Sequence, residues 1–427
     1  MEELELLGLN EKIYIYHTSV GLPIYMWVNE KIKSMYMSLS VKYGSIDTKF
    51  KVGKKVYEVP NGTAHFLEHT KFNIDENTTA HDEFYKIGGD ANAFTTFKYT
   101  NYIVMTTTNQ KENLNLLLDY VYNPYFTKKT INKEKGIIVE EAKSGEDDPY
   151  TLCFFDSLKN TFQKSKYRNL ITGNPDEVNS ITVEDISLVY ETFYHPQNMF
   201  LSLTGNFNPY EMAQLVEDNL TKKDFGEYQN PEVLSELEPK KVSKKENVQN
   251  INVSYPLIKY QIKMPRKTFA EYDDLKLKII TSLILNINFG STSDFVDDMT
   301  TKGLITSMYA NCDIYDEYFL ISITISSNYP KEVIKALESK LNNLQFDETD
   351  FKRKKNALIA TLILDYEDVE NVNMRIQGDI IAYNKIIPNL KEILENIQIT
   401  EALEIISLIS LDNISLNIYK PKENQDE

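Results

Sequence analysis

Two histidines and a glutamate stand close together in the stretch His65-Phe66-Leu67-Glu68-His69. On a helix, positions three and four residues apart share a face, so His65, Glu68 and His69 would project from one side. Neutral imidazole is a common zinc ligand, and a carboxylate that stays off the metal can take a proton from the attacking water. The spacing therefore predicts a catalytic zinc site, with Glu68 as its base. A structural pair of half-buried histidines, hydrogen-bonded by the glutamate, is the alternative interpretation.

A catalytic zinc site normally has a third protein ligand and keeps its fourth position for water. The segment from residue 131 to residue 143 has helical spacing and carries three glutamates that could supply this ligand. Glu134 and Glu141 are seven residues apart and so share a helix face, two turns from each other. Glu140 lies about 100° around the helix from Glu141.

The order H-x-x-E-H is that of the inverzincins. With 71 intervening residues before Glu141, the second glutamate of E-x-x-x-x-x-x-E, it resembles the pitrilysin/insulinase family, which includes the mitochondrial processing peptidases. The resemblance implies one Zn²⁺ per chain, held by His65, His69 and Glu141. It also implies that Glu134 supports the ligands from behind, since such partners fix a ligand's orientation. Glu140 remains the competing third ligand.

Two further segments resemble the same family. Residues 88–96, followed by a strand from Tyr102 to Thr108, resemble the edge strand that pairs with an extended substrate. The resemblance implies five substrate-binding residues: Ala91, Asn92, Ala93, Phe94 and Thr95. Residues 190–205 resemble the end of the family's first domain, and we interpret His195 within them as structural because the motif needs no third imidazole.

Periodicity gives the elements around these motifs. Residues 12–43 alternate between apolar and polar side chains, which predicts half-buried antiparallel strands. Residues 111–122 have the spacing of a helix, and so do residues 131–143. Beyond residue 250 the same element order returns: Lys331-Glu332 opens a helix as Lys111-Glu112 does, at an offset of 220 residues. Under that offset Thr361 falls where Glu141 stands, so we expect the second copy to lack the metal.

The fold class implied by the resemblance is α+β, with two homologous domains that are each a mixed, mainly antiparallel sheet covered by helices. We place a catalytic zinc domain at residues 1–221 and a metal-free homologous domain at residues 251–427. The segment between them, residues 222–250, is rich in Lys, Glu, Asn and Pro and reads as a linker.

Bulk composition excludes several classes of protein. A net charge of −17 over 427 residues argues against a nucleic-acid partner. No run of 18 apolar residues exists, so we expect no membrane partner. Two cysteines are too few for a disulfide framework, and the acidic N-terminus is unlike a signal peptide. We therefore expect a cytoplasmic protein.

The implied function is a zinc-dependent endopeptidase that hydrolyses extended peptides held in a closed chamber, as a processing peptidase for leader or small peptides. Two alternatives stay open: a scaffold subunit that keeps the peptidase fold without catalysis, and a module that binds metal or peptide without cutting. The presence of both the ligands and the base argues against the scaffold.

A partner subunit is implied by what the second half lacks. In self-sufficient relatives, an Arg and a Tyr seven residues later flank a Gly-Leu and reach the substrate. With Gly303-Leu304 as the anchor, these positions hold Met299 and Thr306, and no arginine lies between Arg266 and Arg353. We therefore expect a heterodimer with a homologous non-zinc subunit that carries the Arg/Tyr pair, with a homodimer as the fallback.

Overall fold

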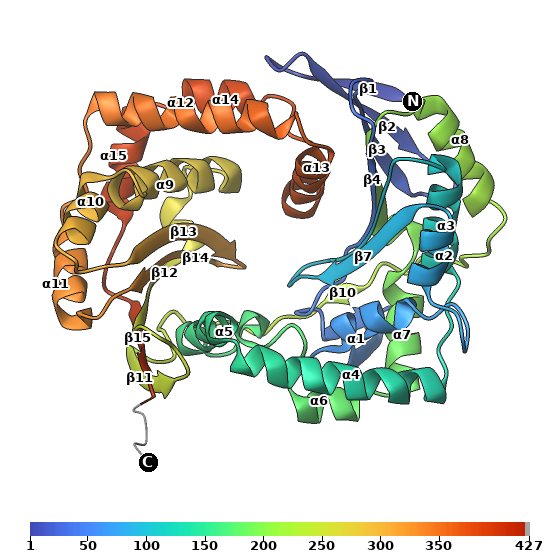
Figure 1. Cartoon of the computed structure of the whole chain (residues 1–427), viewed down its shortest axis with the longest axis horizontal. Helices are drawn as coiled ribbons and strands as arrows, with labels where there is room; N and C mark the ends of the chain where they lie inside the picture. The colour runs from blue at the N-terminus through green and yellow to red at the C-terminus, as the bar shows by residue number, and fades with distance from the viewer. Residues whose placement is uncertain (423–427) are drawn as a thin grey trace. The chain divides into compact units, whose positions relative to one another are not determined.

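The computed structural model describes residues 1–422, without the side chains of residues 146 and 147. The chain divides into two compact units (Figure 1). Unit 1 consists of Met1–Lys143, Leu170–Ser235 and Leu362–Leu390. Unit 2 consists of Ser144–Asn169, Glu236–Thr361 and the residues from Lys391 onward. Each unit thus contains segments from both halves of the sequence.

Unit 1 is built on a seven-stranded sheet in the order β1-β2-β3-β9-β4-β8-β7. Its strands are β1 (Glu2–Leu6), β2 (Glu11–His17), β3 (Pro23–Val28), β4 (Met35–Val41), β7 (Gly89–Thr95), β8 (Thr100–Thr106) and β9 (Met199–Gly205). β3 and β9 are parallel, and the other neighbouring pairs are antiparallel. A small sheet of order β10-β5-β6 lies in the same unit, with β5 (Lys49–Val52), β6 (Lys55–Glu58) and β10 (Glu232–Val233).

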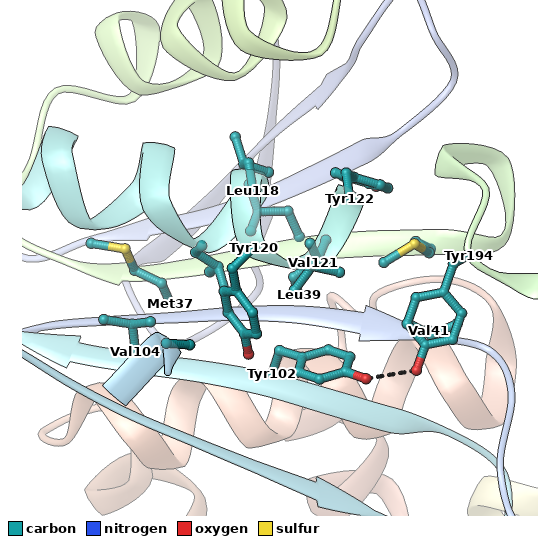
Figure 2. Packing of buried hydrophobic residues seen from close by; sticks show 14 of the residues in the cluster. Met37, Leu39, Val41, Tyr102, Val104, Leu118, Tyr120, Val121, Tyr122 and Tyr194 are labelled. Atoms are coloured by element: carbon teal, nitrogen blue, oxygen red, sulfur yellow. Dashed lines mark hydrogen bonds between the residues drawn. The ribbon is translucent and has the colours of Figure 1, made fainter. Parts of the chain in front are cut away.

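Helices cover both faces of the large sheet (Figure 1). The helices of unit 1 are α1 (Thr63–Lys71), α2 (Ala80–Lys86), α3 (Gln110–Tyr122), most of α4 (Lys128–Asp147), α6 (Pro175–Ser180), α7 (Val183–Phe193), α8 (Pro209–Leu220) and α13 (Val369–Tyr383). α3 and α8 lie on one face and α13 on the other. Met37, Leu39 and Val41 of β4 pack with the apolar side of α3 in the core (Figure 2).

We expected half-buried strands between residues 12 and 43, and this is wrong for β4, which is buried along its whole length. The reason is α13, which covers the second face through polar side chains. Ser38 Oγ donates to Asn373 Oδ1 at 2.6 Å, and Gln377 Nε2 donates to Ser38 Oγ at 3.1 Å. Asn101 Nδ2 of β8 donates to Gln377 Oε1 at 3.1 Å. Polar residues in the strand pattern therefore face a helix and not solvent.

Unit 2 is built on a five-stranded sheet in the order β11-β15-β12-β14-β13, in which only the pair β11 and β15 is parallel. Its strands are β11 (Glu246–Ile251), β12 (Leu257–Pro265), β13 (Ser307–Tyr315), β14 (Tyr318–Ser326) and β15 (Ile414–Pro421). Its helices are α5 (Pro149–Thr161), α9 (Asp274–Phe289), α10 (Asp294–Thr301), α11 (Pro330–Leu341), most of α12 (Glu348–Asp365), α14 (Leu390–Asn396) and α15 (Ile399–Leu408). α5 packs on β12 and β15, where Asn160 Nδ2 donates to Asn417 Oδ1 at 2.7 Å.

The repeat that the sequence predicts is present in the elements. α3, α4 and α5 begin at residues 110, 128 and 149, and α11, α12 and α13 begin at residues 330, 348 and 369, each 220 residues later. α5 and α13 are therefore equivalent helices, and each packs on the sheet formed by the other half of the sequence. Both domains have the predicted α+β plan of a mixed, mainly antiparallel sheet with helices.

The compact units differ from the consecutive ranges that we expected, 1–221, 222–250 and 251–427, because α5 and α13 are exchanged between the halves. The expected linker also contains the strand β10 and all of β11 except its last residue, Ile251. Within the described residues, no helix combines the length and apolar character needed to cross a membrane.

Candidate metal centre

Helix α1 begins directly after Gly62, whose φ of 86° lies in the left-handed region. A Cβ at this position would come within 2.4 Å of the carbonyl oxygen of Thr172, so glycine is needed here. Phe66 and Leu67 are fully buried, at 0% exposure, in the core of unit 1. Their packing fixes the helix, and with it the face that carries both histidines and the glutamate.

The imidazoles of His65 and His69 converge on the carboxylate of Glu141, which α4 supplies. His65 Nε2 lies 3.5 Å from Glu141 Oε1, and His69 Nε2 lies 3.2 Å from Glu141 Oε2. One candidate ligand atom from each of the three residues lies within 4.8 Å of the others. Hydrogen bonds from His65 and His69 hold the pKa of Glu141 well below its ordinary range.

This donor set fits zinc. Two ligand atoms about 2.1 Å from a tetrahedral ion are about 3.4 Å apart, close to the separations seen between Glu141 and each imidazole. Two nitrogens and one carboxylate oxygen form a three-residue set of the kind that catalytic zinc sites use. Among the side chains that the structure describes, this is the one group of three such residues whose ligand atoms converge.

Glu134 lies beside Nδ1 of His69, whereas Glu141 lies beside Nε2 of the same ring. Glu134 Oε2 is 3.8 Å from His69 Nδ1, and Glu134 Oε1 accepts a hydrogen bond from Asn73 Nδ2 at 3.2 Å. Burial lowers the pKa of His69, but the interactions with Glu134 and Glu141 outweigh burial and raise the pKa to about 9. The position of the Glu134 carboxylate beside Nδ1 favours a proton on that nitrogen, while Nε2 faces Glu141.

The competing third ligand, Glu140, points elsewhere. Its carboxylate pairs with Lys143 Nζ at 2.7 Å, and its side chain is 73% exposed. His195 also lies apart from the cluster of His65, His69 and Glu141. Its ring stacks on Tyr228 with 4.9 Å between centroids, and its Nδ1 accepts a hydrogen bond from the backbone N–H of Gln197 at 3.2 Å.

Glu68 is buried and is not one of the converging residues. One oxygen of its carboxylate, Oε2, accepts a hydrogen bond from Thr95 Oγ1 at 2.6 Å. Thr95 is the last residue of β7, the edge strand of the large sheet. The motif helix and the edge strand therefore meet at this contact.

A cavity of about 590 Å³ connects these parts. It is lined by both histidines, Glu68, Glu134 and Glu141, and also by Asn92, Ala93, Phe94 and Thr95 of β7. Ala91 does not line it and is buried instead. Four of the five expected substrate-binding residues are thus brought to the candidate metal centre.

Sequence reasoning missed part of the cavity wall. Phe72 and His81 line it with their rings stacked at 4.4 Å and an interplanar angle of 3°. Lys133, Ile137 and Ile171 line it as well. Phe72 follows the motif by three residues on the same chain segment, which was the available signal. His81 had no signal in the sequence.

Comparison with known proteins places the chain among peptidases. Residues 30–176 match the profile described as insulinase (peptidase family M16), and residues 180–358 match the profile described as peptidase M16 inactive domain. The chain is 34% identical over 337 residues to the zinc protease YmfH of Bacillus subtilis, which covers 78% of this chain and 77% of that protein. It is 25% identical over 372 residues to a mitochondrial-processing peptidase subunit beta of Arabidopsis thaliana, covering 82% of this chain and 68% of that one.

Solved structures agree in fold. An M16-like peptidase from Alicyclobacillus acidocaldarius superposes with a TM-score of 0.91 at 24% identity, covering 98% of this chain and all (100%) of that chain. A protease from Helicobacter pylori superposes with a TM-score of 0.81 at 17% identity, covering 96% of this chain and 100% of that chain.

Proposed function

Because the chain belongs to the insulinase family, peptidase family M16, we propose that it is a zinc-dependent endopeptidase that cleaves extended peptides. The observation that carries the proposal is the convergence of His65, His69 and Glu141 beside a buried carboxylate that stays apart from them. A scaffold would need neither feature.

Each residue of the site has a separate role in the proposed hydrolysis. His65, His69 and Glu141 would hold the zinc ion, and Glu134 would orient His69. Zinc, when bound, supplies Lewis-acid polarisation of the scissile carbonyl. Glu68 takes a proton from the attacking water and passes it to the leaving amine nitrogen, acting first as a general base and then as a general acid.

The peptide lies along β7. β7 pairs with β8 on one side only, so the backbone groups of its other edge are available to an added strand. Asn92, Ala93, Phe94 and Thr95 then border the peptide beside the metal centre. Main-chain pairing of this kind does not depend on sequence, which suits a processing peptidase that trims leader or small peptides. The closed chamber and the cytoplasmic location stay predictions.

A partner subunit completes the enzyme. The relative from Arabidopsis thaliana is by name a subunit. Here the positions expected for the Arg/Tyr pair hold Met299, which is buried at 3% exposure, and Thr306, whose hydroxyl donates to the Ser326 carbonyl at 3.3 Å. We propose a heterodimer with a homologous subunit that carries the pair, with a homodimer as the fallback. The chain purified alone should therefore cut peptides slowly, and fast cleavage by the lone chain would contradict the heterodimer.

The test of the function uses a mixture of unstructured synthetic peptides. The zinc-loaded protein, alone and with a homologous non-zinc subunit, is incubated with the mixture, and new peptide termini are followed by mass spectrometry. We expect new termini that vanish with a chelator and return with zinc. Peptides that stay intact would point to a scaffold, and peptides that are retained uncut would point to a binding module.

A further inference from the structure

The side chain of Thr95 is turned toward Glu68, the proposed base. We propose that Thr95 is the positioning residue of Glu68: its hydroxyl holds one carboxylate oxygen so that the other oxygen faces the attacking water. The proposal rests on the peptidase function proposed above. It assigns to this residue a task distinct from binding the peptide.

The direction of the hydrogen bond follows from its two partners, because the carboxylate oxygen accepts and the Thr95 hydroxyl donates. Thr100 Oγ1 lies 3.5 Å from Thr95 Oγ1 and donates its own proton to the carbonyl oxygen of Tyr43 at 3.0 Å. Thr100 Oγ1 could thus accept the proton of Thr95, but Glu68 Oε2 is the much nearer acceptor, at 2.6 Å. A short hydrogen bond to a charged acceptor is among the stronger kinds, so it can hold the carboxylate in one orientation.

Glu68 is enclosed by aromatic side chains, and of the hydroxyls near it that of Tyr120 has no hydrogen-bond partner among the described residues. Glu68 is only 6% exposed. Three buried tyrosines lie near enough for its charge to contribute to their raised pKa values, after the larger effect of burial: Tyr102, Tyr120 and Tyr194. Tyr102 and Tyr194 are hydrogen-bonded to each other at 2.7 Å (Figure 2). Of the side chains described, Thr95 is the one that donates a hydrogen bond to Glu68.

The hydrogen bond between Thr95 and Glu68 also links the peptide-binding strand β7 to the helix α1 that carries the base. The backbone of Thr95 belongs to β7, the strand along which the peptide is proposed to lie, while its side chain holds the base on α1. The same residue thus sets the distance between peptide and base. Displacing a reacting group by about 1 Å can cost about 10²-fold in rate, so the loss of this contact should appear in turnover.

The first experiment deletes the hydroxyl and keeps the shape. Thr95→Val retains a β-branched side chain suited to a strand, and Thr95→Ser retains the hydroxyl. With a quenched fluorescent peptide library as the probe, we expect Thr95→Val to lower kcat about 10- to 100-fold with KM nearly unchanged, and Thr95→Ser to recover most of the rate. Zinc content and thermal unfolding should match those of the unmodified protein.

Thr106→Val is the matched control. Thr106 is a buried threonine at the other end of the same strand pair, and its hydroxyl lies 2.5 Å from the Thr108 carbonyl and 2.9 Å from the Gly88 carbonyl, away from Glu68. It should leave kcat unchanged. In a Glu68→Gln background, Thr95→Val should add no further loss, because a positioning residue acts through the residue that it positions. A normal kcat in Thr95→Val, an effect on KM alone, or a full additional loss in Glu68→Gln would overturn the proposal.

A second measurement separates this proposal from the peptidase function. If the unmodified protein cleaves no peptide, the peptidase function fails, but crystal structures of the zinc-loaded unmodified protein and of Thr95→Val still test the contact. We expect the Glu68 carboxylate to accept from Thr95 in the first and to change its orientation in the second. An identical Glu68 position in both structures would overturn the positioning role.

Discussion

Glu141 differs from its neighbour Glu140 in one respect that decides between them as ligands. The Glu141 carboxylate lies against both imidazoles, whereas the Glu140 carboxylate pairs with a lysine one turn further along α4. The low pKa of Glu141 keeps it ionised, as a metal ligand must be, across the ordinary pH range.

The pair of variants Glu141→Gln and Glu140→Gln tests this difference. Removing the charge of Glu141 should lower zinc occupancy sharply, while the same change at Glu140 should leave occupancy near one ion per chain. Metal analysis after dialysis gives the answer. Both variants should still unfold cooperatively, because the core is separate from the site. Full zinc content in Glu141→Gln would place the third ligand elsewhere.

Much of the candidate metal centre could be predicted from the sequence at the scale of single residues. Helical spacing was enough to put His65, Glu68 and His69 on one face, and the resemblance pointed to Glu134 and Glu141. The side-chain directions on β7 could not be predicted from the sequence. Ala91 points into the core, and the Thr95 hydroxyl points to Glu68. Such directions depend on how β7 and α1 meet, which no local pattern records.

At the scale of elements, the docking of α13 on the large sheet is the least expected feature. Asn373 is at its centre: besides accepting from Ser38, its Nδ2 donates to the Ser202 carbonyl at 3.1 Å. Its Oδ1 also accepts from Gln377 Nε2 at 2.7 Å. A buried polar network is stabilising only while every member is satisfied.

Asn373→Ala should therefore be costly. It leaves several buried groups without partners, each worth about 1–3 kcal/mol, so we expect a loss of at least about 3 kcal/mol in the free energy of unfolding. Denaturant titration measures it. Asn371→Ala is the control, since Asn371 is exposed on the same helix and should change stability by less than about 0.5 kcal/mol. Equal stabilities of the two variants would show that the network is dispensable.

Asp379, also on α13, makes a pH-dependent contribution. Burial raises its pKa from 3.8 to about 6, against the opposing effects of the hydrogen bond from the Ile387 N–H and the charge of Arg375. Between these two pH values the folded protein holds a proton that the unfolded chain has lost. Stability therefore falls as the pH rises through this window, and the ionised carboxylate remains a cost at pH 7.

Asp379→Asn keeps an oxygen that can accept from Ile387 and removes the charge. We expect it to raise the free energy of unfolding at pH 7 by about 1–2 kcal/mol and to flatten the pH dependence between about pH 4 and 6. Thermal unfolding followed across this range is the measurement. A variant that is less stable than the unmodified protein at pH 7 would mean that the carboxylate is stabilised in its charged form.

Element types and positions followed well from pattern, as the helices at 111–122 and 131–143 illustrate. Both were found, as α3 and as part of α4. The prediction of which strand residues are buried was wrong. Ser38 and Ser40 alternate with apolar residues as solvent-facing positions do, yet both are 0% exposed because a helix distant in sequence covers them. Alternation reports which face is polar, and it cannot report what lies upon that face.

At the scale of the whole molecule, the exchange of α5 and α13 makes the two halves depend on each other. A fragment that ends at Ser235 contains the large sheet without α13, and the remaining fragment contains the smaller sheet without α5. Each would expose buried polar groups and apolar strand surface.

We expect the fragments 1–235 and 236–427 to lack cooperative unfolding when produced singly and to form a stable complex when produced together. Circular dichroism during thermal unfolding and size-exclusion chromatography would show this. A fragment 1–235 that is monomeric, unfolds cooperatively and binds zinc by itself would contradict the mutual dependence and support an autonomous first domain.

The comparison of Glu68→Gln with the unmodified protein tests zinc-dependent peptide hydrolysis most directly. The substitution keeps the shape of the side chain and removes the base. Zinc content and peptide binding should be unchanged, while turnover of the peptide mixture, measured with the partner subunit present, should fall by at least about 10²-fold. Cleavage by Glu68→Gln at the rate of the unmodified protein would contradict the mechanism proposed for this site.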